Sequence, residues 1–187
     1  NSFCGIIAAT AVDDYSNGYI KRHEGTIKKR EKLFENYLKA TGFNAEPVLL
    51  TYEDDENFNK LLQTLKEKRP EYEFSTTDKK LHRLWLIDDE INVEKITSFF
   101  EKKEALYIAD GHHRSASSSL LKKALQKENN HHNGTENYNY FMSYIIPESN
   151  LKISEFNRFI KDLNGLTIDE FLIELDKSYR IEEKGQR

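Results

Sequence analysis

ALYIADGHHRSASSSLL, residues 105–121, is the stretch that decides the predicted fold. Residues 105–109 are a short apolar run followed at once by Asp-Gly, which favours a buried strand over a helix. Gly111 permits a tight turn after that strand. From Ser115 onward, leucines and alanines recur at helical spacing among lysines, which predicts a helix that begins with small side chains. The stretch therefore predicts a strand, a glycine turn and a helix in direct succession.

This arrangement predicts an anion site. Unpaired backbone N–H groups at the start of a helix, together with the helix dipole, favour a phosphate or a carboxylate. The small side chains from Ser115 to Ser118 would let such a ligand approach closely. Arg114 adds a planar guanidinium that matches the oxygens of a phosphate. We predict phosphate or nucleotide binding by Gly111, His113, Arg114 and Ser115, and catalytic roles for the titratable residues Asp110 and His112.

A second polar cluster lies near the start of the chain. KRHEGT, residues 21–26, places two cations, an imidazole and a carboxylate just before a basic helix. Glu24 is the leading candidate for a general base, because a carboxylate near cations stays ionised and can accept a proton from a hydroxyl group. His23 is predicted to contact the substrate. Thr26 is instead a candidate cap of the helix that follows.

The remaining pattern predicts strands with helices between them, neither strictly alternating nor segregated. The fold class is therefore α+β, with a mixed sheet and helices packed around it. Residues 3–12 are predicted to form a strand that returns through a turn at residues 13–18 as a hairpin. The next helix has an apolar face of Leu33, Phe34, Tyr37 and Leu38 and ends near Gly42. Further strands are predicted at residues 47–52 and 138–146, a hairpin at 72–87, and helices around residues 58–65, 93–100 and 171–179.

Three other positions carry polar side chains of interest. His82 and Arg83 are adjacent in a predicted strand and face opposite sides, so at most one of them can point into a common pocket. We predict that His82 does, and that Arg158 also contacts the ligand. His131 and His132 form an adjacent pair in an Asn-rich loop without neighbouring carboxylate or cysteine ligands, so no metal site is assigned there.

Composition limits the class of protein. The chain has 187 residues, 32% charged and 37% hydrophobic, with a formal charge of −4, which gives no overall basic field and argues against nucleic acid as a partner. No apolar run approaches the roughly 18 residues needed to span a bilayer. One cysteine excludes an internal disulfide and fits a reducing cytoplasm. The sequence contains none of the motifs GxGxxG, P-loop, CxxC, HExxH or GxSxG.

Five motifs carry a resemblance to a known family. They are KRHEGT, GFNAEPVLLTY, LHRLW, ADGHHR and NRFIKDLNGL, and they extend over nearly the whole chain. In this order they resemble a bacterial and archaeal family catalogued as domain of unknown function ten-fifteen. Its members are longer, so the resemblance implies that residues 1–187 form a single domain and are a fragment lacking an N-terminal portion. The Asp-Gly-His-His-Arg turn is also similar to the phosphate-binding turn of the ParB and sulfiredoxin superfamily, which includes free-serine kinases.

These observations lead to three functional hypotheses. The first is a phosphotransferase that uses a nucleoside phosphate with Mg²⁺ and acts on a small hydroxyl-bearing metabolite, with Glu24 or His112 moving the proton. The second is a non-catalytic nucleotide-sensing module of the ParB type. The third, a metal-dependent hydrolase using Asp110 and both histidines of the turn, is disfavoured because adjacent histidines do not easily share one ion. The partners predicted are thus a small molecule and a nucleotide, with no membrane; the oligomeric state stays open.

Overall fold

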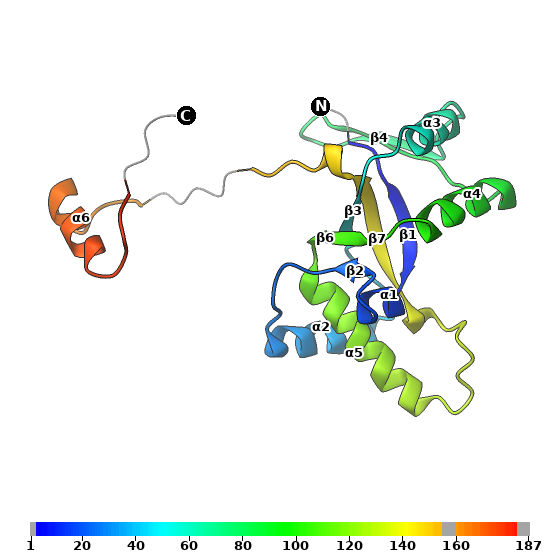
Figure 1. The fold of residues 1–187 in the computed structure, drawn as a ribbon, viewed down its shortest axis with the longest axis horizontal. Coiled ribbons are helices and arrows are strands. Elements are labelled where there is room, and N and C mark those ends of the chain that lie inside the picture. Colours follow the sequence, from blue (N-terminus) through cyan, green and yellow to red (C-terminus); the bar gives the residue numbers. More distant parts are fainter. Residues whose placement is uncertain (1–2, 155–159, 183–187) are drawn as a thin grey trace. The chain divides into compact units, whose positions relative to one another are not determined.

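The computed structural model of the chain describes residues 3–154 and 160–182. Contacts divide the chain into two compact units, residues 1–152 and residues 153–187 (Figure 1). The single domain expected from the sequence stays a prediction. None of the helices in the described ranges is long and apolar enough to cross a membrane.

The first unit is built on a five-stranded sheet with the strand order β1-β7-β3-β6-β2. Neighbouring strands alternate between antiparallel and parallel pairing along this order, so the sheet is mixed and the predicted α+β class is confirmed. The long apolar strand β7 lies inside the sheet, between β1 and β3. The bounds are β1 Ile6–Ala11, β2 Ile20–Lys21, β3 Val48–Tyr52, β6 Leu106–Asp110 and β7 Tyr140–Pro147.

The predicted hairpin at the start of the chain is wrong. Helix α1, Val12–Ser16, follows β1 directly, and β1 and β2 lie at opposite edges of the sheet. The sequence Asp-Asp-Tyr-Ser-Asn-Gly indicated a hairpin turn. However, Val12 and Tyr15 are three residues apart and both are buried, and one turn of helix places both side chains on the same buried face. The chain thereby crosses from one edge of the sheet to the other before the polar cluster of residues 21–26.

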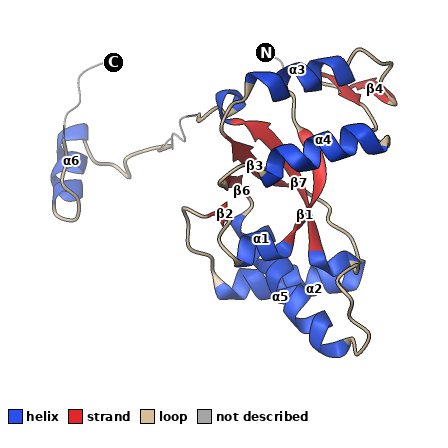
Figure 2. Cartoon of the chain, turned by 45° about the vertical axis from the view of Figure 1, so that its right-hand side comes forward, coloured by secondary structure: helices blue, strands red, loops and turns tan. Residues whose placement is uncertain are grey.

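The helices around the sheet fall into two groups, of which one gathers at one end of the sheet and the other lies above and beside it (Figure 2). Helices α1, α2 and α5 form one group, and α3 and α4 form the other. Tyr52 at the end of β3 packs among Phe58, Phe99 and Phe100 of α3 and α4, in a cluster of edge-to-face and stacked rings. The helices are α2 Lys28–Thr41, α3 Glu56–Leu65, α4 Glu90–Glu101 and α5 His112–Glu128, with 3-10 turns at Asn137–Asn139 and Glu148–Asn150.

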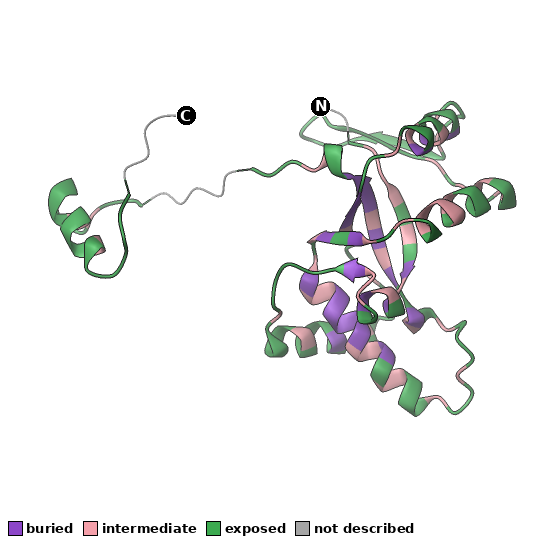
Figure 3. Ribbon diagram, in the orientation of Figure 1, coloured by how far each residue is buried: buried purple, intermediate pink, exposed green. Residues whose placement is uncertain are grey.

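Helix α2 buries a different face from the one predicted. It ends at Gly42 in the left-handed conformation, as expected, but Leu33, Phe34 and Tyr37 are exposed and its buried residue is Glu35. Helix α2 packs against α5, and Glu35 is paired with Lys32 at 2.8 Å. Buried residues are concentrated along the first half of α5 (Figure 3), and these are mainly serines, whose hydroxyl groups accommodate a polar facing surface.

The predicted hairpin at residues 72–87 is confirmed by β4, Tyr72–Ser75, and β5, Leu81–Leu84, which pair with each other in a separate two-stranded sheet. All eight of their residues are exposed. In the second unit, α6, Ile168–Asp176, begins with a capping box made by Thr167 and Glu170, which confirms the last predicted helix.

Candidate functional site

The glycine turn has the predicted geometry, with one difference. Strand β6 ends at Asp110, Gly111 adopts a φ of 101°, and α5 begins immediately at His112 rather than at Ser115. A side chain at Gly111 would place its Cβ 3.0 Å from Arg114 Nε and 3.3 Å from Val48 Cα. Only glycine therefore combines this backbone conformation with so close a contact.

The start of α5 presents unpaired backbone donors. Ser115 N–H is the first to donate within the helix, at 3.0 Å from the carbonyl oxygen of Gly111. The N–H groups of His112, His113 and Arg114 precede it and have no hydrogen-bond acceptor among the described residues. These donors lie at the positive end of the helix dipole, where an anion is stabilised.

The two polar clusters of the sequence meet at this point. Strand β2 runs parallel to β6, with Ile20 opposite Leu106, and carries the residues after it to the start of α5. The rings of His23 and His112 make an edge-to-face contact at 4.4 Å, and His23 N–H donates to His112 Nε2 at 3.5 Å. Glu24 lies 3.9 Å from His112 Nδ1 and 3.8 Å from His23 Nε2. Glu24, His23 and His112 thus form one group at the helix start.

His112 differs from its neighbours in its burial. Its side chain is 5% exposed, whereas that of Glu24 is 66% exposed. Burial, followed by the proximity of His23, lowers the pKa of His112 below its ordinary value, and the carboxylates of Glu24 and Asp110 oppose this shift only in part. The imidazole is therefore neutral near pH 7. Because its Nε2 accepts from His23 N–H, its one proton is assigned to Nδ1, the nitrogen that faces Glu24.

Arg114 is held between two carboxylates. Its Nη2 lies 2.7 Å from Asp110 Oδ2 and its Nη1 lies 2.5 Å from Glu46 Oε2. Arg114 Nε is buried and has no hydrogen-bond partner among the described residues. Asp110, predicted to be catalytic, is therefore the ion-pair partner of Arg114. Glu46 was not predicted as a site residue, because it meets Arg114 only through the tertiary fold.

The small residues of α5 serve helix packing. Ser115 is fully buried, and its hydroxyl group lies 3.3 Å from the carbonyl oxygen of Gly111, so both of its donors have partners within the turn. Ser117 donates to the carbonyl oxygens of His113 and of Glu31 in α2. The space that the sequence suggested for a ligand along residues 115–118 is thus filled by neighbouring elements.

Another predicted ligand contact, His82, lies away from this group. His82 in β5 stacks on Phe74 at 5.1 Å, in the hairpin that lies at the end of the sheet opposite α5. His113 is half-buried, and its Nδ1 has no partner within the described part of the chain. Arg158 lies outside the described residues.

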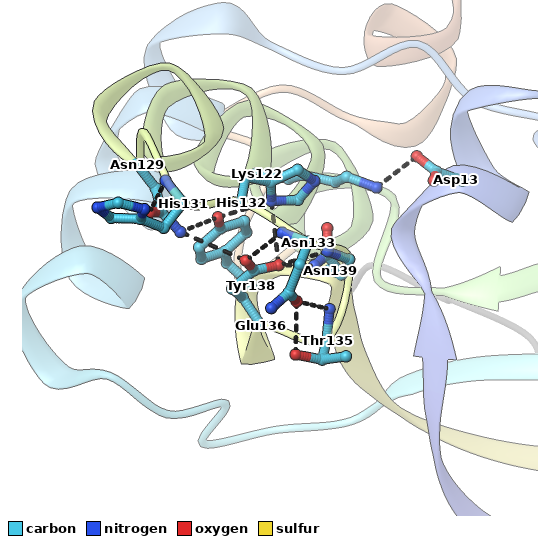
Figure 4. A network of polar contacts seen from close by, with 11 residues as sticks. Asp13, Lys122, Asn129, His131, His132, Asn133, Thr135, Glu136, Tyr138 and Asn139 are labelled. Carbon is cyan, nitrogen blue, oxygen red and sulfur yellow. Dashed lines mark hydrogen bonds and ion pairs between the residues drawn. The ribbon is translucent and has the colours of Figure 1, made fainter.

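The loop after α5 is closed by a network of its own (Figure 4). The Glu136 carboxylate accepts hydrogen bonds from Asn133 N–H, Gly134 N–H and Asn139 Nδ2 at 2.8–2.9 Å, and His132 Nδ1 lies 3.0 Å from it. The expectation that the histidine pair has no neighbouring carboxylate is therefore wrong, because Glu136 of the same loop is a structural partner of His132. No group of three or more histidine, cysteine or acidic side chains placed to hold a metal occurs in residues 3–154 and 160–182.

Comparisons with known proteins give one match. The family model described as "Protein of unknown function (DUF1015)" matches residues 1–187. Searches of curated proteins and of solved structures found no match.

Proposed function

The chain belongs to the DUF1015 family, and we propose that it is a phosphotransferase that binds a nucleotide at the start of α5 and acts on a small hydroxyl-bearing metabolite. The observation that carries this proposal is the meeting of Glu24 and His112 beside three unpaired backbone N–H groups. A proton acceptor and an anion site in contact are the two elements that phosphoryl transfer requires.

The phosphate would be bound chiefly by the backbone. The N–H groups of His112, His113 and Arg114 lie at the positive end of the helix dipole, and Gly111 lets the Arg114 guanidinium lie against the turn. The proposal keeps the assignment suggested by the sequence, in which the Asp-Gly-His-His-Arg motif resembles the phosphate-binding turn of the ParB and sulfiredoxin superfamily. Its likeness to free-serine kinases favours a small hydroxyl acceptor.

Glu24 would take the proton of the acceptor, with His112 acting beside it. The hydroxyl oxygen forms a bond to the terminal phosphorus as the bond to the leaving nucleoside diphosphate breaks, and the hydroxyl proton passes to the exposed carboxylate of Glu24. His112 Nδ1 lies 3.9 Å from that carboxylate. For His112 to take the proton instead, its own proton would have to lie on Nε2, which gives up the hydrogen bond from His23 N–H and leaves Nδ1 as the acceptor.

The residues at the site fit a Mg²⁺ ion bound with the nucleotide. Mg²⁺ usually takes one or two protein carboxylates together with phosphate oxygens and water, and Asp110 and Glu24 are exposed carboxylates beside the turn. The ion would neutralise phosphate charge. Without phosphate, these two carboxylates alone are too few to hold it.

The test combines binding with turnover. Full-length protein would be screened by thermal shift against ATP, ADP, CTP and pyrophosphate with Mg²⁺, since a ligand that binds the folded state raises its apparent stability. His112→Gln and Glu24→Gln are expected to retain the shift and lose phosphate transfer to hydroxyl acceptors. His82→Gln, remote from the turn, is the matched control.

The outcomes separate the hypotheses. A shift with phosphate transfer that Glu24→Gln or His112→Gln abolishes supports the phosphotransferase. A shift without turnover in any variant would instead support the nucleotide-sensing module of the ParB type. No shift with any of the four ligands would refute both.

A further inference from the structure

We propose that Glu46 occupies the anion position on Arg114 and restricts the site to ligands able to displace a carboxylate, phosphoryl groups above all. This inference rests on the proposed function and makes Glu46 a specificity-determining residue. It begins from the two ion pairs of Arg114, with Asp110 at 2.7 Å and with Glu46 at 2.5 Å.

The three partners differ in how firmly the fold holds them. The Arg114 side chain is 25% exposed and lies against Gly111, close enough that a Cβ there would meet its Nε at 3.0 Å. Asp110 belongs to the same turn. Both carboxylate side chains are largely exposed, Asp110 at 74% and Glu46 at 72%, but Glu46 comes from a separate segment, residues 43–47 between α2 and β3. Glu46 is therefore the partner that can leave while the guanidinium stays in place.

The charges show which ligands can replace Glu46. Asp110 and Glu46 contact the guanidinium, Glu24 lies beside His112, and His112 is neutral. A carboxylate ligand would give Arg114 the contact that it already has from Glu46. A phosphoryl group brings a higher charge and three oxygens, which can bond the guanidinium and the helix N–H groups together. Glu46 thus favours phosphoryl ligands over carboxylates.

The experiment measures anion affinity by calorimetry on full-length protein. Pyrophosphate and succinate, each with Mg²⁺, would be titrated into wild type, Glu46→Gln and Glu94→Gln. Glu94→Gln removes the same charge from an exposed position on α4 and is the matched control. We expect Glu46→Gln to lower the Kd for pyrophosphate by about threefold to tenfold. The variant removes the competing ion pair of Glu46 with Arg114 and the repulsion between Glu46 and the anion. Its effect on succinate should be larger still.

Adding Arg114→Ala to Glu46→Gln should abolish the gain in pyrophosphate affinity, because the guanidinium for which Glu46 and the ligand compete is then absent. Two results would overturn the role of Glu46 and leave the proposed function standing. One is that wild type and Glu46→Gln bind pyrophosphate with the same Kd. The other is that Glu46→Gln and Glu94→Gln lower this Kd equally. No pyrophosphate or nucleotide binding by any variant would overturn both. Glu46→Gln should fold normally, because it alters one exposed side chain.

Discussion

Replacement of Gly111 by alanine tests the geometry of the turn most directly. The backbone at this position has a φ of 101°, which costs an L-residue about 1–2 kcal/mol. The new methyl group would also lie 3.0 Å from Arg114 Nε and 3.1 Å from its Nη2, so the guanidinium must move and its ion pairs with Asp110 and Glu46 weaken. Each exposed pair contributes up to about 1 kcal/mol. We expect a total loss of about 2–3 kcal/mol in the free energy of unfolding.

Two other glycines separate these contributions. Gly18 has a φ of 80°, and a Cβ added there would have no atom within 4 Å, so Gly18→Ala should show the backbone cost alone, about 1 kcal/mol. Gly25 has neither a positive φ nor a close neighbour, and Gly25→Ala should leave stability within about 0.5 kcal/mol of wild type.

Urea unfolding followed by the fluorescence of the single tryptophan, Trp85, measures all three variants. The expected order of destabilisation is Gly111→Ala, then Gly18→Ala, then Gly25→Ala. If Gly111→Ala were no less stable than Gly18→Ala, the contact between the turn and Arg114 would be too weak to fix the guanidinium, and the reasoning about the turn would fail.

Three further predictions concern stability. The pKa of His112 in the folded state lies below its ordinary value of 6.5. Between these two pKa values the unfolded chain binds more protons than the folded chain, so wild-type stability should fall as the pH drops below about 6.5. His112→Gln should flatten that fall in urea titrations at several pH values; an unchanged slope would contradict it. Desolvation alone would raise the pKa of Glu136, but hydrogen bonds from backbone N–H groups and from Asn139 outweigh it and hold that pKa at about 2. Glu136→Gln weakens these hydrogen bonds and should expose residues 129–139 to limited proteolysis. Equal cleavage rates for the variant and wild type would refute this. Leu33→Ser should change the unfolding free energy by less than about 0.5 kcal/mol, whereas Leu50→Ala should cost about 2–5 kcal/mol, because Leu33 is exposed and Leu50 is buried.

The sequence predicted the elements whose signals are local. Gly111 after a short apolar run indicated the strand, turn and helix, and Gly42 indicated the end of α2. The start of α5 was placed three residues too late, because His112, His113 and Arg114 carry no apolar periodicity even though they form the first helical turn.

Features that depend on distant partners could not be predicted in the same way. Ile20 pairs with Leu106, which lies far from it along the chain, and no local pattern in the sequence indicates that pairing. The buried face of α2 depends on its packing against α5, a distant segment of the chain, and the buried Glu35 is paired with Lys32. From the sequence, Glu24 and His112 were alternative candidates for the same proton transfer, without any indication of where they lie. The structure brings the two side chains within 3.9 Å.

Strand β2 is only two residues long, and it lies at the edge of the sheet. Its register with β6 consists of two residue pairs, Ile20 with Leu106 and Lys21 with Tyr107. Backbone amides there should exchange with solvent by local opening, well before the interior strands β7 and β3 do. Such an opening separates Glu24 and His23 from His112 while the core stays folded, so a ligand that bridges the two halves must slow the exchange of this strand.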